Sequence, residues 1–547
     1  MDDDRNKLTY SNVFDYPLET DSIFRIFLFA LVSITVIIGN YIPSFLTDTG
    51  SSPLAIFPVT EFYDVDKVFS SPPEEFFRNV MLFLRPITIQ ILYMILIFGI
   101  SFAIYKKRPA GIIKKNDLKE INDREAVEAL DNIRSKAGLS GKIFYYTNNK
   151  ILDFSAQVFG AGKNLYLRAG KGLMIIIRKK NFDLFESILL HEFAHIKNRD
   201  ISKTYFAESV LKIPFLITLL TSVILMFFAL TKSIISRMID TGISFGVLFE
   251  KILVYLNLFG QITILLMLLF LIFRMLIRSR EYYADLRAAS WKSAEFLKIH
   301  LDKNYEKEAA ENFTERIFGY HPSSGNRSEI LSDPIKIFKP SYKRIYIDTL
   351  VSYIFFSGAF IYGISFLLLV FTITGYSMLY LLKGMIDEVV HLTLVYTEMI
   401  FASVCMLLFL FLCGILMRKT FFFQTEKILI TQKYKKDPKA FFPEIMKLSL
   451  FSSLGIISGF MLLPLYGFNV LYLKNLISIP FVFAITFTGF VLLNLFHYFW
   501  MDHKITNEYK VDYSVPVVLR IFEGAAIVII FLSAILSFQF FSVLIFN

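Results

Sequence analysis

The run ITILLMLLFLIF at residues 262–273 decides the fold class of this 547-residue chain. It is apolar throughout, and about 20 apolar residues let a helix cross the hydrocarbon layer of a bilayer. A second run, MLLFLFLCGILM at 406–417, has the same character. Because 55% of the residues are hydrophobic and 19% are charged, against about a quarter charged in soluble domains, we expect a polytopic integral membrane protein.

Apolar runs of sufficient length recur along the whole chain. They predict nine membrane spans, at 26–46, 85–105, 209–231, 252–277, 349–374, 394–417, 447–468, 476–499 and 521–545. The leader MDDDRNKLTY is acidic, and no small-residue cleavage site follows the first apolar run. We therefore expect the first span to be a retained anchor.

Basic residues set the expected orientation of these spans. Lys and Arg are concentrated at 106–115 and at 418–442, whereas the loop 47–78 is rich in Pro, Ser and acidic residues. Because positively charged loops stay on the cytoplasmic side, the segments that follow the second and sixth spans should be cytoplasmic. The same bias explains the net charge of +10 without any nucleic-acid partner.

The first long cytoplasmic segment has the pattern of a small α+β domain. A helix is predicted at 121–138 and another at 182–198. Four β-rich runs lie between them, at 142–147, 151–159, 164–168 and 172–177.

The second of these helices carries the motif His191-Glu192-Phe193-Ala194-His195. Residues i and i+4 lie on one face of a helix, so both imidazoles can bind one metal ion. Zinc prefers such ligands, and a catalytic zinc keeps three protein ligands and one water. Glu192 can take the proton of the zinc-bound water, which is the chemistry of a metallopeptidase.

The third ligand is expected in Arg280-Glu281-Tyr282-Tyr283-Ala284-Asp285. Glu281 would bind the zinc, and Asp285, one helical turn later, would accept a hydrogen bond from a zinc-binding histidine. The predicted third and fourth spans form a hairpin between the two motifs. Both motifs therefore return to the same face of the membrane.

Together these stretches resemble the HtpX and CAAX prenyl protease family of membrane zinc metallopeptidases, which are gluzincins. The motifs are HEFAHIKNRD at 191–200, SREYYAD at 279–285 and HPSSGNR at 321–327, which is similar to the HPxxxxR motif of the family. The run SAQVFG at 155–160 matches the Asn-Ala edge-strand signature, with Ser in place of Asn. The resemblance covers about residues 85–335.

The resemblance implies a mechanism and a set of partners. A protein or peptide substrate would add as a strand along the edge near Ala156 and Gly160, and Glu192 would deliver the water. His321 would stabilise the oxyanion or gate the site, and Arg327 would anchor its loop. One Zn²⁺ is implied per chain, and the lipid bilayer is the other expected partner.

These observations divide the chain into three expected regions. Residues 1–105 form a two-span anchor, 106–348 form the cytoplasmic zincin-type domain interrupted by the hairpin at about 209–277, and 349–547 form a five-span domain. Ionisable residues in the five spans of the last region are few and lie near the span ends, namely Glu398, Arg520 and Glu523. Four further histidines show no ligand spacing and are predicted to be structural or solvated, namely His300, His391, His497 and His503.

The leading hypothesis is a zinc endopeptidase of the cell (inner) membrane that cleaves membrane proteins at the cytoplasmic surface. One alternative is a BlaR-type sensor, although such receptors have ExxCD where this chain has ExxAD. A second is a non-catalytic membrane scaffold, which conflicts with the complete set of catalytic residue types. A third is a transporter, which would place ionisable groups deeper in the bundle.

Overall fold

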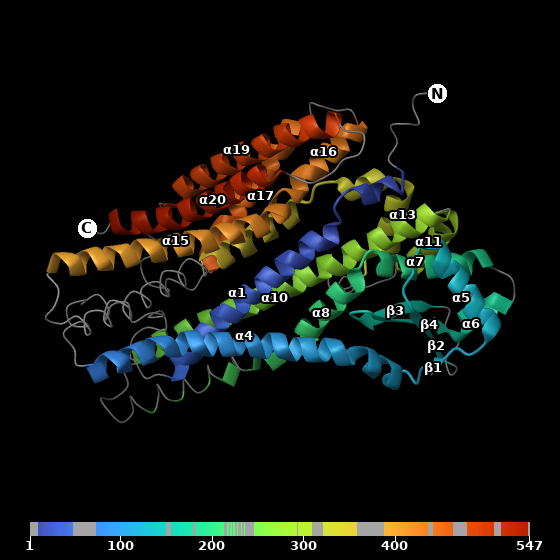
Figure 1. Cartoon of the computed structure of the whole chain (residues 1–547), viewed down its shortest axis with the longest axis horizontal. Helices are drawn as coiled ribbons and strands as arrows, with labels where there is room; N and C mark the ends of the chain where they lie inside the picture. Colours follow the sequence, from blue (N-terminus) through green and yellow to red (C-terminus); the bar gives the residue numbers. More distant parts are fainter. Residues whose placement is uncertain are drawn as a thin grey trace.

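The computed structural model describes most of the chain. The described residues are 9–46, 73–148, 155–178, 182–212, 245–292, 294–308, 321–357, 388–435, 441–462, 478–507 and 516–544, with single positions between 216 and 235. Long helices dominate, and one small sheet lies at one end of the molecule (Figure 1).

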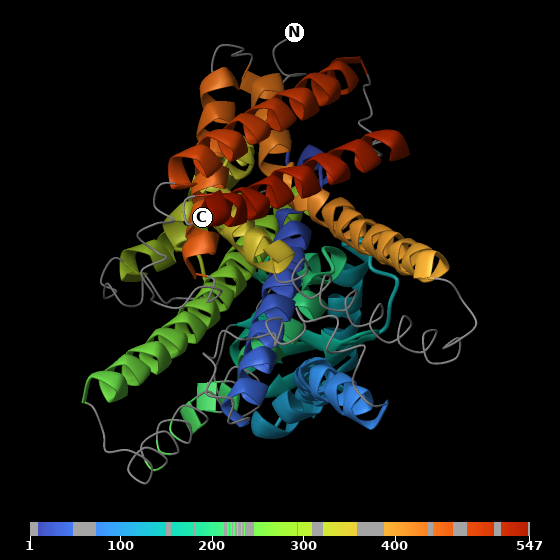
Figure 2. The same ribbon diagram turned by 90° about the vertical axis from the view of Figure 1, so that its left-hand side faces the viewer.

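The longest helices form a bundle in layers. They are α1 (Glu19–Leu46), α4 (Pro73–Lys115), α10 (Phe245–Trp291), α15 (Glu388–Phe421), α17 (Phe441–Leu462), α19 (Ser478–Asn507) and α20 (Val517–Leu544). The C-terminal helices gather on one side and α4 lies on the other, with α1 and α10 between them (Figures 1 and 2).

Five helices of the described residues are long and apolar enough to cross a membrane. They contain the candidate spans Ile262–Trp291, Leu407–Gln432, Phe441–Gly459, Ile479–Asp502 and Val517–Ser537. Each overlaps a span predicted from the sequence. Helices α1 and α4 contain two further predicted spans, and the predicted spans 209–231 and 349–374 lie largely outside the described residues. The total of nine spans stays a prediction.

The sheet has four strands in the order β1-β2-β4-β3. The strands are β1 (Lys119–Glu120), β2 (Ile143–Asn148), β3 (Ala156–Ala161) and β4 (Asn164–Gly170). β3 and β4 pair antiparallel, β2 and β4 pair parallel, and β1 and β2 pair antiparallel. β3 is therefore an edge strand, as the SAQVFG run predicted.

Shorter helices complete this end of the molecule. They are α5 (Arg124–Lys136), α6 (Lys171–Arg178), α7 (Phe182–Lys197), α8 (Asp200–Lys212), α11 (Glu295–Glu308) and α13 (Ser324–Ser332), with 3-10 turns at Asn12–Asp15 and Pro334–Phe338. The short helix α16 (Phe423–Lys435) packs instead on α17 and α19 of the C-terminal bundle. The prediction of a strand at 172–177 was wrong, because that run is helix α6. Its Leu173 is fully buried, and the helix packs on α7 and β4, so tertiary packing overrides the β preference of its isoleucines.

Helix α7 is held by apolar side chains at helical spacing. Phe185, Leu189 and Phe193 recur every four residues, and all three are fully buried. They belong to one core that also contains Phe159 of β3 and Tyr283 of α10. The core therefore ties the edge strand, α7 and the end of α10 into one rigid unit.

Close helix packing holds the C-terminal bundle together. A Cβ atom at Gly414 of α15 would lie 2.5 Å from the carbonyl oxygen of Gly524 in α20. Because no larger side chain fits there, the glycine pair lets the two backbones touch, as small residues do between membrane helices. The bundle reaches α1 through ion pairs from Arg344 and Lys427 to Glu19.

Candidate active site

Two histidines of one helix and a glutamate that is distant in sequence meet beside the edge strand. His191 and His195 come from α7, and Glu281 comes from α10. The ligand atoms of the three residues all lie within 4.8 Å of one another. Nε2 of His191 is 3.4 Å from one oxygen of Glu281, and Nε2 of His195 is 3.7 Å from the other.

The three residues fit a zinc ion. Two imidazoles and one carboxylate form the ligand set of many catalytic zinc sites. Nε2 of His195 is buried and has no hydrogen-bond partner among the described residues, which is costly unless another ligand occupies it. His191 and Glu281 are also buried, so the donors converge on a point shielded from bulk water.

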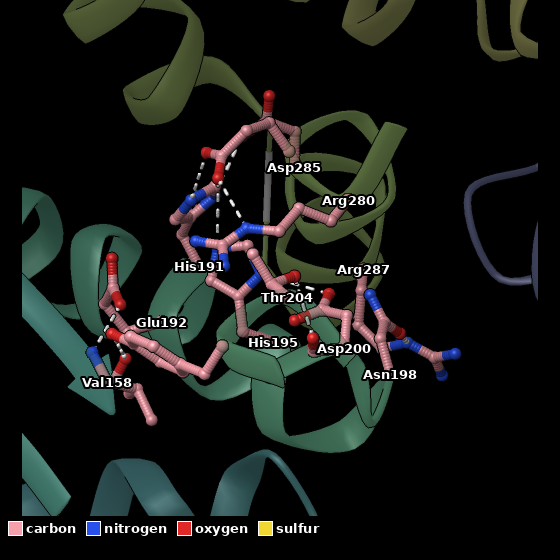
Figure 3. Close-up of polar contacts among 12 residues, drawn as sticks. Val158, His191, Glu192, His195, Asn198, Asp200, Thr204, Arg280, Asp285 and Arg287 are labelled. Carbon is pink, nitrogen blue, oxygen red and sulfur yellow. Dashed lines mark hydrogen bonds and ion pairs between the residues drawn. The ribbon is translucent and has the colours of Figure 1, made fainter. Parts of the chain in front are cut away.

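A carboxylate orients the first histidine. Nδ1 of His191 lies 2.8 Å from Oδ1 of Asp285 (Figure 3). Arg327 donates two hydrogen bonds of 2.7 Å each, from Nε and Nη2, to the two oxygens of Asp285. The arginine therefore fixes the carboxylate that fixes the imidazole.

A second carboxylate orients the other histidine. Nδ1 of His195 lies 3.1 Å from Oδ2 of Asp200, which is fully buried. The turn between them contains Arg199, whose φ of +56° is left-handed and ends α7. Sequence reasoning missed Asp200, although an acidic residue five positions after a metal-binding histidine was visible in HEFAHIKNRD.

The carboxylates favour the charged forms of their partners. Burial lowers the pKa of His191, but the contacts with Asp285 and Glu281 outweigh it and raise the pKa to about 10. Burial likewise opposes the charge of Arg327, yet Asp285 and Glu281 raise the pKa of the guanidinium. The site is therefore a tightly coupled set of charges, in which removing one member leaves another without its partner.

Glu192 points from α7 toward the edge strand. Its Oε2 accepts a hydrogen bond of 2.8 Å from the backbone N–H of Val158 (Figure 3). The predicted base thus extends from α7, which carries two members of the metal-ligand cluster (His191, His195 and Glu281), to the edge strand β3.

The structure places the other predicted residues around this cluster. His321 is 68% exposed, with Nδ1 3.8 Å from an oxygen of Glu281, and Nη1 of Arg327 is 3.9 Å from the other oxygen. Arg280, which sequence reasoning did not single out, donates from Nε to Glu281 at 3.0 Å. The roles of His321 and Arg327 stay predictions.

Ala156 and Gly160 both lie on the edge strand β3. At Gly160 a Cβ atom would lie 2.4 Å from the carbonyl oxygen of Asn164, across the tight turn to β4. The turn itself therefore requires glycine at this position, whether or not it contacts a substrate.

A second buried ionic cluster lies in the C-terminal bundle. This C-terminal cluster consists of Arg418, Glu426, His497 and Glu523, from α15, α16, α19 and α20. Glu523 contacts both Arg418 and Nδ1 of His497, and Nε2 of His497 is 3.8 Å from Glu426. The sequence left His497 as either structural or solvated. In the structure its side chain is fully buried, so it is not solvated.

Comparison with known proteins supports the site. Residues 135–335 match the family model for peptidase family M48. No curated protein and no solved structure matches the chain. The matched range contains the edge strand, both histidines, Glu281, Asp285 and Arg327, and members of this family are metallopeptidases. The match at 135–335 confirms the resemblance predicted from the motifs, namely to the HtpX- and CAAX-protease-like zinc metallopeptidases of family M48.

Proposed function

We propose that this protein is a membrane-embedded zinc endopeptidase that hydrolyses peptide bonds of membrane or membrane-associated proteins. The observation that supports this proposal most strongly is the convergence of His191, His195 and Glu281 next to Glu192, inside the range that matches peptidase family M48. A non-catalytic scaffold would have no need for this set of donors, each oriented by its own carboxylate or arginine.

The protein side chains have separate roles in the proposed reaction. Zinc held by the three ligands would act as a Lewis acid, which would polarise the scissile carbonyl and lower the pKa of the attacking water. Glu192 accepts the proton of the attacking water and returns it to the leaving amine. We propose that His321, which is exposed beside Glu281, donates a hydrogen bond to the oxygen that becomes negative.

The same elements suggest where the substrate comes from. Glu281 lies on α10, whose candidate span Ile262–Trp291 continues without a break into the site. Peptide segments close to the bilayer would therefore reach the cluster first. We propose that Ala156 and Gly160 contribute to the edge along which the peptide lies. We also propose that 106–348 form the peptidase domain, that 1–105 anchor it, and that 349–547 form a separate five-span membrane domain.

Glu192→Gln tests the proposed chemistry. Glutamine keeps the shape of the side chain but cannot act as a base, so zinc should stay bound while proteolysis falls about 10²-fold or more. Membrane proteomes of cells that carry the wild type or this variant should differ in a small set of uncleaved proteins. Normal cleavage by the variant in detergent would contradict the role of Glu192.

Sidedness is tested by cysteine labelling. The basic segments predict that the site faces the cytoplasm of the cell (inner) membrane. Single cysteines at Ser140 and Ser323, in a background that lacks Cys405 and Cys413, should react with an impermeant thiol reagent only after permeabilisation. A cysteine at Ser51 should react in intact cells. Labelling of the cysteines at positions 140 and 323 in intact cells would show that the site faces outward.

A further inference from the structure

The hydrogen-bonding register of β3 decides which of its residues face away from β4. The backbone N–H of Gly170 donates to the carbonyl oxygen of Ser155 at 2.9 Å. In an antiparallel pair, hydrogen-bonded and non-bonded positions alternate, so the odd-numbered residues of β3 face β4. The N–H and C=O groups of Ala156, Val158 and Gly160 therefore point away from the sheet.

At Val158 both outward-facing groups already have partners from the protein itself. The N–H donates to Glu192 at 2.8 Å, and the C=O accepts from the hydroxyl of Tyr205 on α8 at 3.4 Å. A carboxylate that accepts and a hydroxyl that donates are the two functions that the main chain of an added strand would supply. The pair thus imitates one residue of a bound peptide.

Tyr205 is held in this position by α4. The guanidinium carbon of Arg108 lies 4.0 Å from the centre of the Tyr205 ring, and Arg108 also forms an ion pair with Glu208. Tyr205 is 5% exposed, and burial raises the pKa of its phenol, so the hydroxyl stays protonated and can donate. A peptide strand would need to lie about 4.8 Å from β3, in the space that this side chain occupies.

We propose that the main chain of the substrate binds at Val158. In the free enzyme Glu192 and Tyr205 occupy the N–H and C=O of this residue, and both side chains are displaced when a peptide binds. The proposal rests on the proposed peptidase function. The peptide carbonyl would accept from the N–H of Val158, and the peptide N–H would donate to its C=O. Release of Glu192 then makes the base available only when a substrate is in place.

Hydrogen exchange at the Val158 amide tests the Glu192 contact without any substrate. The side-chain carbonyl that Glu192→Gln introduces can still accept from this N–H, whereas Glu192→Ala removes the acceptor. Exchange at Val158 should therefore be faster in Glu192→Ala than in Glu192→Gln, on the order of tenfold. Equal exchange in two variants of equal thermal stability overturns the proposal.

Peptide binding tests displacement of Tyr205. In the inactive Glu192→Gln background, Tyr205→Phe removes the hydroxyl and keeps the ring on Arg108. Tyr10→Phe is the matched control, because Tyr10 also donates to a backbone carbonyl, that of Leu331, at 2.7 Å. A fluorescent, unstructured casein peptide should bind the Tyr205→Phe protein about threefold more tightly than the control.

Two outcomes separate this proposal from the proposed function. Equal binding of the casein peptide to the two double variants, or no slowing of Val158 exchange when the peptide is added, overturns Val158 as the binding position. Wild-type protein without zinc or without proteolysis would instead contradict the peptidase function, and the exchange difference at Val158 would still be measurable.

Discussion

The metal-ligand cluster and the C-terminal cluster both combine histidine with buried carboxylates, but in different arrangements. In the first, one ring nitrogen of each histidine contacts an orienting carboxylate, and the other turns toward Glu281. In the C-terminal cluster a single histidine lies between two glutamates, and Arg418 contacts one of them. Among the described residues, only the first brings three donor residues within reach of one ion. Burial and charge alone therefore do not make a metal site; convergence of donors does.

The two clusters also differ in how many helices supply their histidines and carboxylates. Both histidines of the metal-ligand cluster lie on one helix, four residues apart, so their separation is fixed by helix geometry. Each member of the C-terminal cluster comes from a different helix. We therefore expect the first cluster to control zinc binding and catalysis, and the second to control the stability of the bundle.

Removing the metal should have the largest effect. A strong chelator should abolish proteolysis, because without zinc the carbonyl is not polarised and Glu192 has no acidified water to deprotonate. Adding Zn²⁺ back should restore activity, while the helix content of the C-terminal bundle, measured by circular dichroism, stays unchanged. Full activity after zinc has been removed would show that the chemistry does not depend on the metal.

Asp285→Ala should weaken zinc binding on the order of 10- to 100-fold without abolishing it. The substitution removes the carboxylate that contacts Nδ1 of His191 and leaves Arg327 without its bidentate partner. A competition titration with a chromophoric chelator measures the change. A loss as complete as that of Glu281→Ala would make Asp285 a direct ligand instead.

Asp200→Ala should weaken zinc binding by a smaller factor, about tenfold. Its contact with His195 is longer, at 3.1 Å against 2.8 Å, and no arginine donates two hydrogen bonds to it among the described contacts. The same titration checks this order of effects. Unchanged affinity would show that the Asp200 contact does not orient His195.

Glu523→Gln should leave zinc affinity unchanged within about twofold and still lower stability. Breaking a buried pair by removing one charge costs about 3–5 kcal/mol, because Arg418 and His497 lose their buried partner. Thermal unfolding in detergent, compared with the exposed substitution Glu128→Gln, measures the loss. A large fall in zinc affinity would show that the two clusters are coupled.

The sequence predicted those features that depend on short-range spacing. The HExxH pair, the β-rich run that contains most of β3 and the long apolar helices follow from local sequence patterns. Asp200 was not predicted, because its contact with His195 depends on the left-handed backbone conformation of Arg199, which turns the chain back. The helical conformation of α6 and the burial of His497 depend on which distant elements pack against them. A local sequence pattern does not contain this information.

Zinc content tests the central claim most directly. Purified wild-type protein should contain about one equivalent of zinc, because three ligands and an open position form one catalytic site. His195→Ala should lose most of this zinc, whereas His497→Ala, which alters the buried histidine of the other cluster, should retain it. Equal zinc in wild type and His195→Ala, or loss of zinc in His497→Ala alone, would contradict the assignment of the metal to His191, His195 and Glu281.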